Sequence, residues 1–302
     1  MSSVKSVKVF HYDAFSTMPD KGNPAGVVFT GDLCSKSEMQ EIAFKVGFNE
    51  TAFIASSDKA DLKINYFTPG HEMDLCGHGT IACLYGLYEQ RLLPPKEELT
   101  IETKAGILPI KLKVDNSGRM YITMKQAQPK FMEFRGSQKE LALAIGLKED
   151  DLSEELPIMY GSTGIWTLLI PIRSLSAFKK MKPDNQLFPK ILTENPKASL
   201  HPFCLETEQE GADMHARHFS SPFSKTVEDP VTGTASGVMG AYYASYIKEQ
   251  AKKPLHLIIE QGLEMNRAGT VLVTVSEGDN GLGIEVTGTA VYVNEMEINI
   301  GH

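Results

Sequence analysis

The chain has 302 residues and a formal net charge of −8, and hydrophobic and charged residues make up 42% and 23% of it. These proportions are typical of a soluble globular protein with two domains of ordinary size. The acidic balance argues against nucleic acid or an anionic membrane as partner. The N-terminus has no apolar signal core, and the four cysteines form no C-x-x-C pair. We therefore expect a cytoplasmic protein with reduced thiols.

The first half of the chain mixes strand patterns with two helical patterns. Alternation of apolar residues predicts strands, and apolar spacing near 3.6 residues predicts helices. The turn residues 22–26 are expected to break the sheet, and Ser35 or Ser37 to cap the first helix. The expected elements are strands at 7–12, 27–29, 51–55 and 62–67, helices at 37–46 and 80–90, and strands at 100–102 and 107–114.

The second half repeats that order of elements. Gly79-Thr80 recurs 154 residues later as Gly233-Thr234 at the start of another helix. A shared motif in a shared order indicates an internal duplication. The expected elements are strands at 165–172, 212–219, 255–260 and 270–276, short helices at 175–181 and 184–192, and a turn running into a long helix within 228–250.

The two matched helices, 80–88 and 235–247, carry small or apolar residues on every face. A helix that is apolar all round is buried. We therefore predict an α/β (α+β) fold of two similar domains, each a curled, mostly antiparallel or mixed sheet around a central buried helix. The predicted domains are 1–127, completed by a C-terminal strand at 289–302, and 128–288.

Glycines stand at the start of both buried helices. Gly77 and Gly79 precede or open the first, and Gly233 opens the second. Helix N-termini present backbone N–H groups without intrahelical partners and carry partial positive charge, and glycine lets a ligand come close. Two such ends facing one cleft would bind a small anion, most simply a carboxylate. The alternative is that Gly and Thr merely cap two helices.

Five sequence blocks occur in the order found in one known family. The chain resembles the phenazine biosynthesis PhzF-like proteins, which share the fold of diaminopimelate epimerase and proline racemase. The resemblance covers nearly the whole chain and implies two similar α/β domains with the site between them. The blocks are DAFS with GNPAGVV (13–16 and 22–28), NETAFI (49–54), CGHGTIA (76–82), EDPVTGTASG (228–237) and EQGLEMNRAG (260–269).

The resemblance assigns roles to individual residues. The family's acid/base carboxylate falls on Glu50, its site histidine on His78, and its second-domain aspartate on Asp229. The family's usual serine is replaced by Thr234, which keeps the hydroxyl and adds a methyl group. The predicted substrate- and anion-binding residues are Gly77, Gly79, Gly233, Thr234 and Asn23.

Each candidate also has an ordinary structural explanation. Most glutamates are solvated surface groups, yet Glu50 lies between Phe48 and an apolar strand, where partial burial would suit it to acid/base work. His78 stands between two glycines and has no apolar stripe to join. Asp229 before Pro230 could simply start a turn, or it could orient the imidazole of His78.

Two other kinds of site are not favoured by the sequence. His215 and His218 lie in one expected strand, where they would point to opposite faces and could not share a metal ion. The chain contains neither of the two glycine-rich phosphate-binding motifs. We therefore predict no metal and no organic cofactor.

The resemblance leaves two kinds of proton transfer to compare. Fold relatives with two-base chemistry place one cysteine at each helix start, and Cys76 matches the first position. Its counterpart is Pro230 or Thr232, which carries no thiol. We predict an isomerase in which Glu50 alone shuttles a proton, with Cys76 a small packing or vestigial residue.

Two alternatives to this isomerase remain, a non-catalytic binding or regulatory paralogue and, less favoured, a two-base racemase. The expected partner is a small carboxylate, and a homodimer is the assembly to test.

Overall fold

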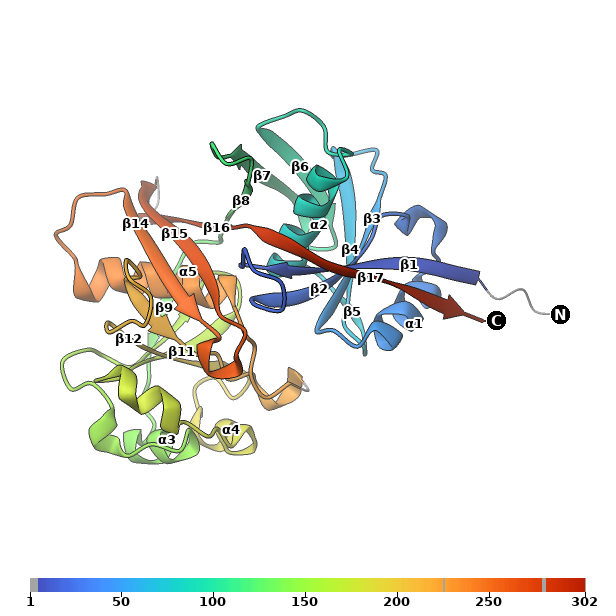
Figure 1. Ribbon diagram of the computed structural model, residues 1–302. Helices are drawn as coiled ribbons and strands as arrows, with labels where there is room; N and C mark the ends of the chain where they lie inside the picture. Colours follow the sequence, from blue (N-terminus) through green and yellow to red (C-terminus); the bar gives the residue numbers. More distant parts are fainter. Residues whose placement is uncertain (1–4, 225, 279–280, 302) are drawn as a thin grey trace. The chain divides into compact units, whose positions relative to one another are not determined.

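The structure is a computed structural model that describes residues 5–224, 226–278 and 281–301. Two compact units divide the chain. Unit 1 comprises Met1–Met124 and Thr287–His302, and unit 2 comprises Lys125–Val286. Each unit is described by itself below, with the element labels of Figure 1.

Unit 1 is a mixed sheet that surrounds one helix. β1 pairs in antiparallel register with β17 and β2, β2 runs parallel to β3, and β4 joins β3 to β6. The pairing of β1 with β17 ties the two ends of the chain into one sheet. The elements are β1 (Lys5–Ala14), β2 (Asn23–Val28), η1 (Gly31–Leu33), α1 (Lys36–Val46), β3 (Glu50–Ala55), β4 (Leu62–Phe67), β5 (Glu72–Met73), α2 (Gly77–Glu89), β6 (Glu98–Thr103), β7 (Gly106–Val114), β8 (Met120–Lys125) and β17 (Ala290–Ile300).

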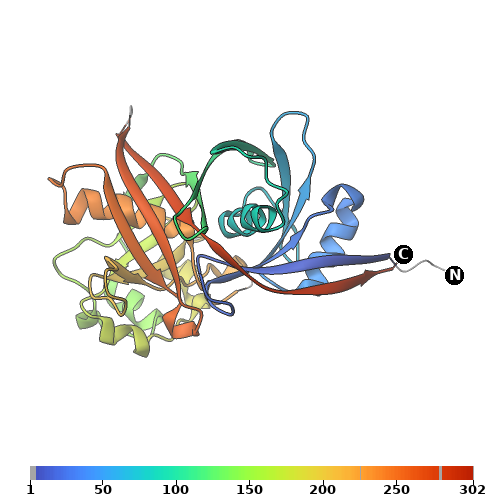
Figure 2. The same ribbon diagram turned by 45° about the horizontal axis from the view of Figure 1, so that its top comes forward.

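Helix α2 is the core of unit 1. Figure 2 looks nearly along its axis and shows strands of the same unit around it. Most of its residues from Gly79 to Leu87 are buried. A Cβ atom at Gly86 would lie 2.9 Å from Phe29 and 3.0 Å from the ring of Tyr12. The close approach of helix and sheet therefore requires glycine at this position.

Helix α1 covers the other face of the unit 1 sheet. Ser35 accepts a hydrogen bond from the Glu38 amide, and the Glu38 carboxylate accepts one from the Ser35 amide, which forms a capping box. Met39, Ile42 and Ala43 pack with sheet residues such as Val9. The expected helix and one of its two expected caps are therefore confirmed.

Unit 2 is a second mixed sheet around a second helix. Its strands run from β9 to β15 in chain order across the sheet, with parallel pairs at β11–β12 and β13–β14. The elements are β9 (Lys130–Glu133), α3 (Gln138–Ala144), η2 (Glu149–Asp151), β10 (Met159–Ser162), β11 (Trp166–Pro171), η3 (Leu175–Lys180), η4 (Asn185–Leu187), α4 (Phe188–Ile191), β12 (Ser199–Cys204), β13 (Met214–Ala216), η5 (Pro222–Ser224), α5 (Gly233–Tyr242), the π-helical turn η6 (Tyr243–Ile247), β14 (Leu255–Gln261), η7 (Leu263–Met265), β15 (Gly269–Gly278) and β16 (Gly281–Gly288).

Helix α5 is buried on every side from Ala235 to Tyr242. A separate apolar cluster holds α3 and α4 against the sheet through residues such as Leu141, Phe188 and Leu200. The mixed α+β architecture, with one buried helix in each half, confirms the predicted fold class.

Several expected elements differ from the structure. Helix α2 starts at Gly77 rather than Thr80, and α5 passes into the π-helical turn at Tyr243. The expected strand 212–219 is assigned as a strand only at Met214–Ala216, although the same antiparallel pairing to β12 continues through the Arg217 amide to the Pro202 carbonyl and the bridge of Phe219 with Leu200.

The expected break at 22–26 is confined to Gly22. There φ is +68°, and a Cβ would lie 2.3 Å from the Ala14 carbonyl oxygen, so this position requires glycine. The residues that follow, Asn23–Val28, already form β2.

Candidate active site

Glu50 is the first residue of β3, close after the end of α1. Gly47 ends that helix in the left-handed conformation, with φ of 74°. Ala25 is the register partner of Glu50, and Tyr12 is that of Ala25. Register partners point to the same face of a sheet, and the Tyr12 ring contacts α2. The Glu50 side chain therefore points to the face that holds α2.

The start of α2 places two functional side chains next to Glu50. His78 Nε2 lies 3.3 Å from Glu50 Oε2. Cys76 is the N-cap residue, and its Sγ accepts a hydrogen bond from the Gly79 amide at 3.3 Å. The same Sγ lies 3.5 Å from His78 Nδ1. One imidazole is thus held between a carboxylate and a sulfur.

The three side chains are nearly covered but not sealed. Those of His78 and Glu50 are 12% and 13% exposed, and Cys76 is buried. Burial raises the pKa of the Cys76 thiol, and the nearby Glu50 carboxylate raises it further, so the thiol is protonated at neutral pH.

Burial lowers the pKa of His78, but its contacts with Cys76 and Glu50 outweigh burial and place that pKa well above its usual range. The contacts of this ring therefore favour its protonated form.

A buried chain of hydrogen bonds fixes the N-cap of α2. Thr80 Oγ1 donates to the Cys76 carbonyl at 2.7 Å, which uses the only hydrogen of that hydroxyl. The Tyr66 hydroxyl, 2.6 Å away, must therefore donate to Thr80 Oγ1. Thr80 belongs to the repeated Gly-Thr motif, whereas the role of Tyr66 on β4 was not predicted, because its sequence context is that of an ordinary core aromatic.

The structure changes the interpretation of two predicted residues at this helix start. Cys76 was expected only to pack or to be vestigial, but its sulfur caps α2 and contacts the His78 ring. Gly79 was expected to offer its amide to an anion, but that amide already donates to Cys76 Sγ. The amides of Gly77 and His78 are the first two of the helix, which have no acceptor within it.

The predicted residues of unit 2 lie at the start of α5. The Asp229 carboxylate accepts a hydrogen bond from Thr232, the N-cap residue. Gln261 Nε2 donates to the Asp229 carbonyl at 2.8 Å, and Gln261 Oε1 accepts from the Thr232 amide at 3.1 Å. A Cβ at Gly262 would lie 2.7 Å from the Pro230 carbonyl oxygen. The blocks EDPVTG and EQG are therefore packed directly against each other.

The remaining predicted residues have simpler positions. Gly233 and Thr234 are the first two residues of α5, and the Thr234 carbonyl accepts a hydrogen bond from Thr163 at 3.1 Å. Asn23 opens β2, is fully buried and is the register partner of Ala14.

Three histidines of unit 2 belong to two separate buried clusters. His215 lies between Glu260 and Glu264, at 2.7 and 3.0 Å. His218 Nδ1 instead lies 3.2 Å from His201 Nδ1. His215 and His218 thus contact different partners, as their expected opposite orientations require.

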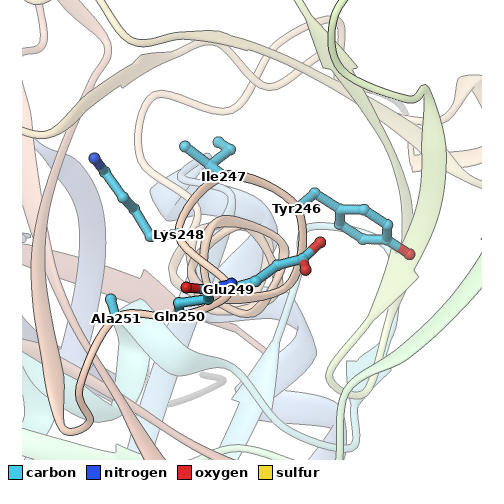
Figure 3. A pocket seen from close by; sticks show the side chains of 6 residues that line it. All are labelled: Tyr246, Ile247, Lys248, Glu249, Gln250 and Ala251. Carbon is cyan, nitrogen blue, oxygen red and sulfur yellow. The ribbon is translucent and has the colours of Figure 1, made fainter.

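A hollow beside the end of the α5 segment is shown in Figure 3. The six residues that line it, Tyr246–Ala251, are consecutive. Polar groups from separate elements do not meet among them, so we assign no site to this hollow.

The family of the chain follows from comparison with known proteins. A family model described as phenazine biosynthesis-like protein, PhzC-PhzF, matches residues 12–296. The chain belongs to the PhzC-PhzF family. It is 52% identical to the uncharacterized isomerase YfhB of Bacillus subtilis over 289 residues, which cover 96% of this chain and 97% of that protein. It is 27% identical to trans-2,3-dihydro-3-hydroxyanthranilate isomerase of Pseudomonas aeruginosa, over 94% of this chain and 96% of that one.

Solved structures with the same fold include a member of this family and a more distant protein. A Bacillus anthracis PhzF-family protein is 54% identical, with a TM-score of 0.96 over 98% of this chain and 100% of that one. A hydroxyproline epimerase from Agrobacterium vitis, 12% identical, matches with a TM-score of 0.64 over 100% and 95% of the two chains, which shows the shared fold alone. The predicted family, epimerase-like fold and enzyme class, an isomerase, are confirmed.

Within the described residues of this PhzC-PhzF protein, no helix is long and apolar enough to cross a membrane.

Proposed function

We propose that this PhzC-PhzF protein isomerises a small carboxylic acid by moving one proton between two carbons, with Glu50 as the only base and no organic cofactor. The observation that carries the proposal is the pairing of Glu50 with His78, two partly covered side chains 3.3 Å apart at the start of a buried helix. A carboxylate that is positioned but still reachable can take a proton from a bound acid and return it.

The other groups at this helix start have supporting roles in the proposal. His78 holds Glu50 in place and donates to the negatively charged part of the substrate. The amides of Gly77 and His78 bind the substrate carboxylate, since helix N-termini favour anions. Cys76 positions the His78 ring and does not transfer the proton.

The start of α5 supports one base rather than two. A two-base racemase of this fold would need a second thiol at the matching helix start. The N-cap of α2 is Cys76, and the N-cap of α5 is Thr232. A threonine hydroxyl in that position lacks the acidity of a thiol, so the second base is missing.

Unit 2 is proposed to supply further substrate contacts. Asp229, which is tied to the N-cap of α5, and the first amides of that helix, at Gly233 and Thr234, are the candidates. Asn23 in unit 1 completes the proposed binding set.

The test is uptake of deuterium from D₂O into a bound acid, followed by NMR or mass spectrometry. The first acid to try is trans-2,3-dihydro-3-hydroxyanthranilate, because a relative is named for it. Small carboxylic acids selected by thermal shift follow. Exchange in the wild type and its loss in Glu50→Gln would support the proposal. Tight binding without any exchange would favour the alternative, a non-catalytic binding or regulatory paralogue.

A further inference from the structure

We propose that Glu50, Cys76 and His78 together form a binding site for a thiophilic divalent cation such as Zn²⁺. One ligand atom from each of the three side chains lies within 4.8 Å of the other two. A thiolate, an imidazole and a carboxylate are all ligands that zinc accepts. Three protein ligands with a fourth position left for water are typical of an open zinc site.

Two of the three distances between ligand atoms are near those of such a site. With Zn–S near 2.3 Å and Zn–N and Zn–O near 2.0–2.2 Å, the ligand atoms of a tetrahedral site lie roughly 3.3–3.6 Å apart. His78 Nε2 lies 3.3 Å from Glu50 Oε2 and 3.8 Å from Cys76 Sγ. A shift of a few tenths of an ångström would bring the His78 ring and the sulfur to the separation of two zinc ligands, and the third pair, Glu50 with Cys76, lies within 4.8 Å.

The surroundings suit a bound cation. The thiolate and the carboxylate balance its two positive charges. The Gly79 amide, which donates to Cys76 Sγ, is the outer hydrogen bond that a zinc-bound thiolate usually receives. On coordination the thiol proton, and the proton on the coordinating imidazole nitrogen, pass to solvent. His78 and Glu50 are partly exposed, which gives the ion a path to the site.

The buried cluster around His215 lacks this property. Both ring nitrogens of His215 are already hydrogen-bonded, one to Glu260 and one to Glu264, and no sulfur takes part in these contacts. The site at the start of α2 therefore carries the proposal alone.

A cation at this site would occupy the Glu50 oxygens. If Glu50 is the proton shuttle, zinc inhibits the enzyme, and a chelator restores it. This consequence rests on the proposed function, whereas cation binding does not.

The test is titration of chelator-treated protein with Zn²⁺ by calorimetry and with Co²⁺ by absorption. A thiolate-to-cobalt charge-transfer band reports directly on sulfur coordination. We expect one ion per chain in the wild type. Cys76→Ser should lose the cobalt band and bind zinc more than about tenfold more weakly, since even outer-shell changes cost 10–100-fold. Serine is a good N-cap, so this variant keeps α2.

Cys34→Ser is the matched control, because Cys34 is also a buried cysteine of unit 1 and lies outside the cluster. It should bind zinc and cobalt like the wild type. Absence of binding in the wild type, or unchanged binding in Cys76→Ser, would overturn the metal site. A wild type that binds zinc but never exchanges deuterium would keep the metal site and refute the proposed function.

Discussion

Acid should destabilise unit 2 through His218. Its ring is buried, and its Nδ1 lies 3.2 Å from Nδ1 of a second buried ring, His201. Burial lowers the pKa of His218 from 6.5 to about 4, although Asp229 acts in the opposite direction. Burial and His218 together also hold the pKa of His201 well below its usual range. Both rings are therefore neutral in the folded protein at neutral pH, and one of the two facing nitrogens donates to the other.

The sign and size of the effect follow from this shift. Between pH 6.5 and pH 4 the unfolded chain binds a proton at His218 that the folded chain does not bind. The contribution of His218 to the free energy of unfolding is therefore fully present above pH 6.5 and is lost as the pH falls toward 4. The difference between the pKa of 6.5 and the lowered pKa of about 4 corresponds to about 3.4 kcal/mol in full. Through His218 alone, lowering the pH from 7 to 5 should remove about 2 kcal/mol of the free energy of unfolding.

Urea unfolding can be followed by the fluorescence of Trp166, the only tryptophan, which packs against the apolar cluster of unit 2. In His218→Asn the amide keeps a polar group near Nδ1 but does not titrate. The loss of stability between pH 7 and pH 5 should therefore be about 2 kcal/mol smaller than in the wild type. His256→Asn replaces an exposed histidine of the same unit and should behave like the wild type. Equal pH dependence in His218→Asn and the wild type would refute the reasoning.

Three further predictions concern the start of α2, assayed with chelator present. Glu50→Gln should abolish deuterium exchange while the affinity for the acid, by calorimetry, stays within about tenfold; exchange at a near wild-type rate would exclude Glu50 as the shuttle. Cys76→Ser should keep most of the exchange activity, and a loss as large as that of Glu50→Gln would contradict the single base. Tyr66→Phe should lower the free energy of unfolding by about 1 kcal/mol. Tyr88→Phe is the control and should change thermal melting little, because the Tyr88 hydroxyl donates to an exposed carbonyl. Equal effects of the two substitutions would show that the Tyr66 hydrogen bond contributes nothing to stability.

The sequence predicted the parts of the fold that depend on local pattern. Burial of α2 and α5 follows from their lack of a polar face, and the cap of α1 follows from Ser35 and Glu38. Six strands had no expected counterpart, namely β5, β8, β9, β10, β12 and β16. Their neighbours in the sheet, not their own sequence, decide their conformation, so a short apolar run gives no clear period.

The candidate site shows the same limit at the level of single residues. Glu50 and His78 could be named from their motifs, and the structure brings them to 3.3 Å. The involvement of Cys76 depends on three-dimensional facts: α2 begins three residues earlier than its pattern suggests, and this makes Cys76 the N-cap. An N-cap side chain bends back toward the first amides of its helix, and here that also brings the sulfur to the ring of His78. Cys76, two positions before His78, is thereby placed in contact with the ring of that histidine. The same geometry creates the proposed cation site, which the sequence pattern gave no reason to expect.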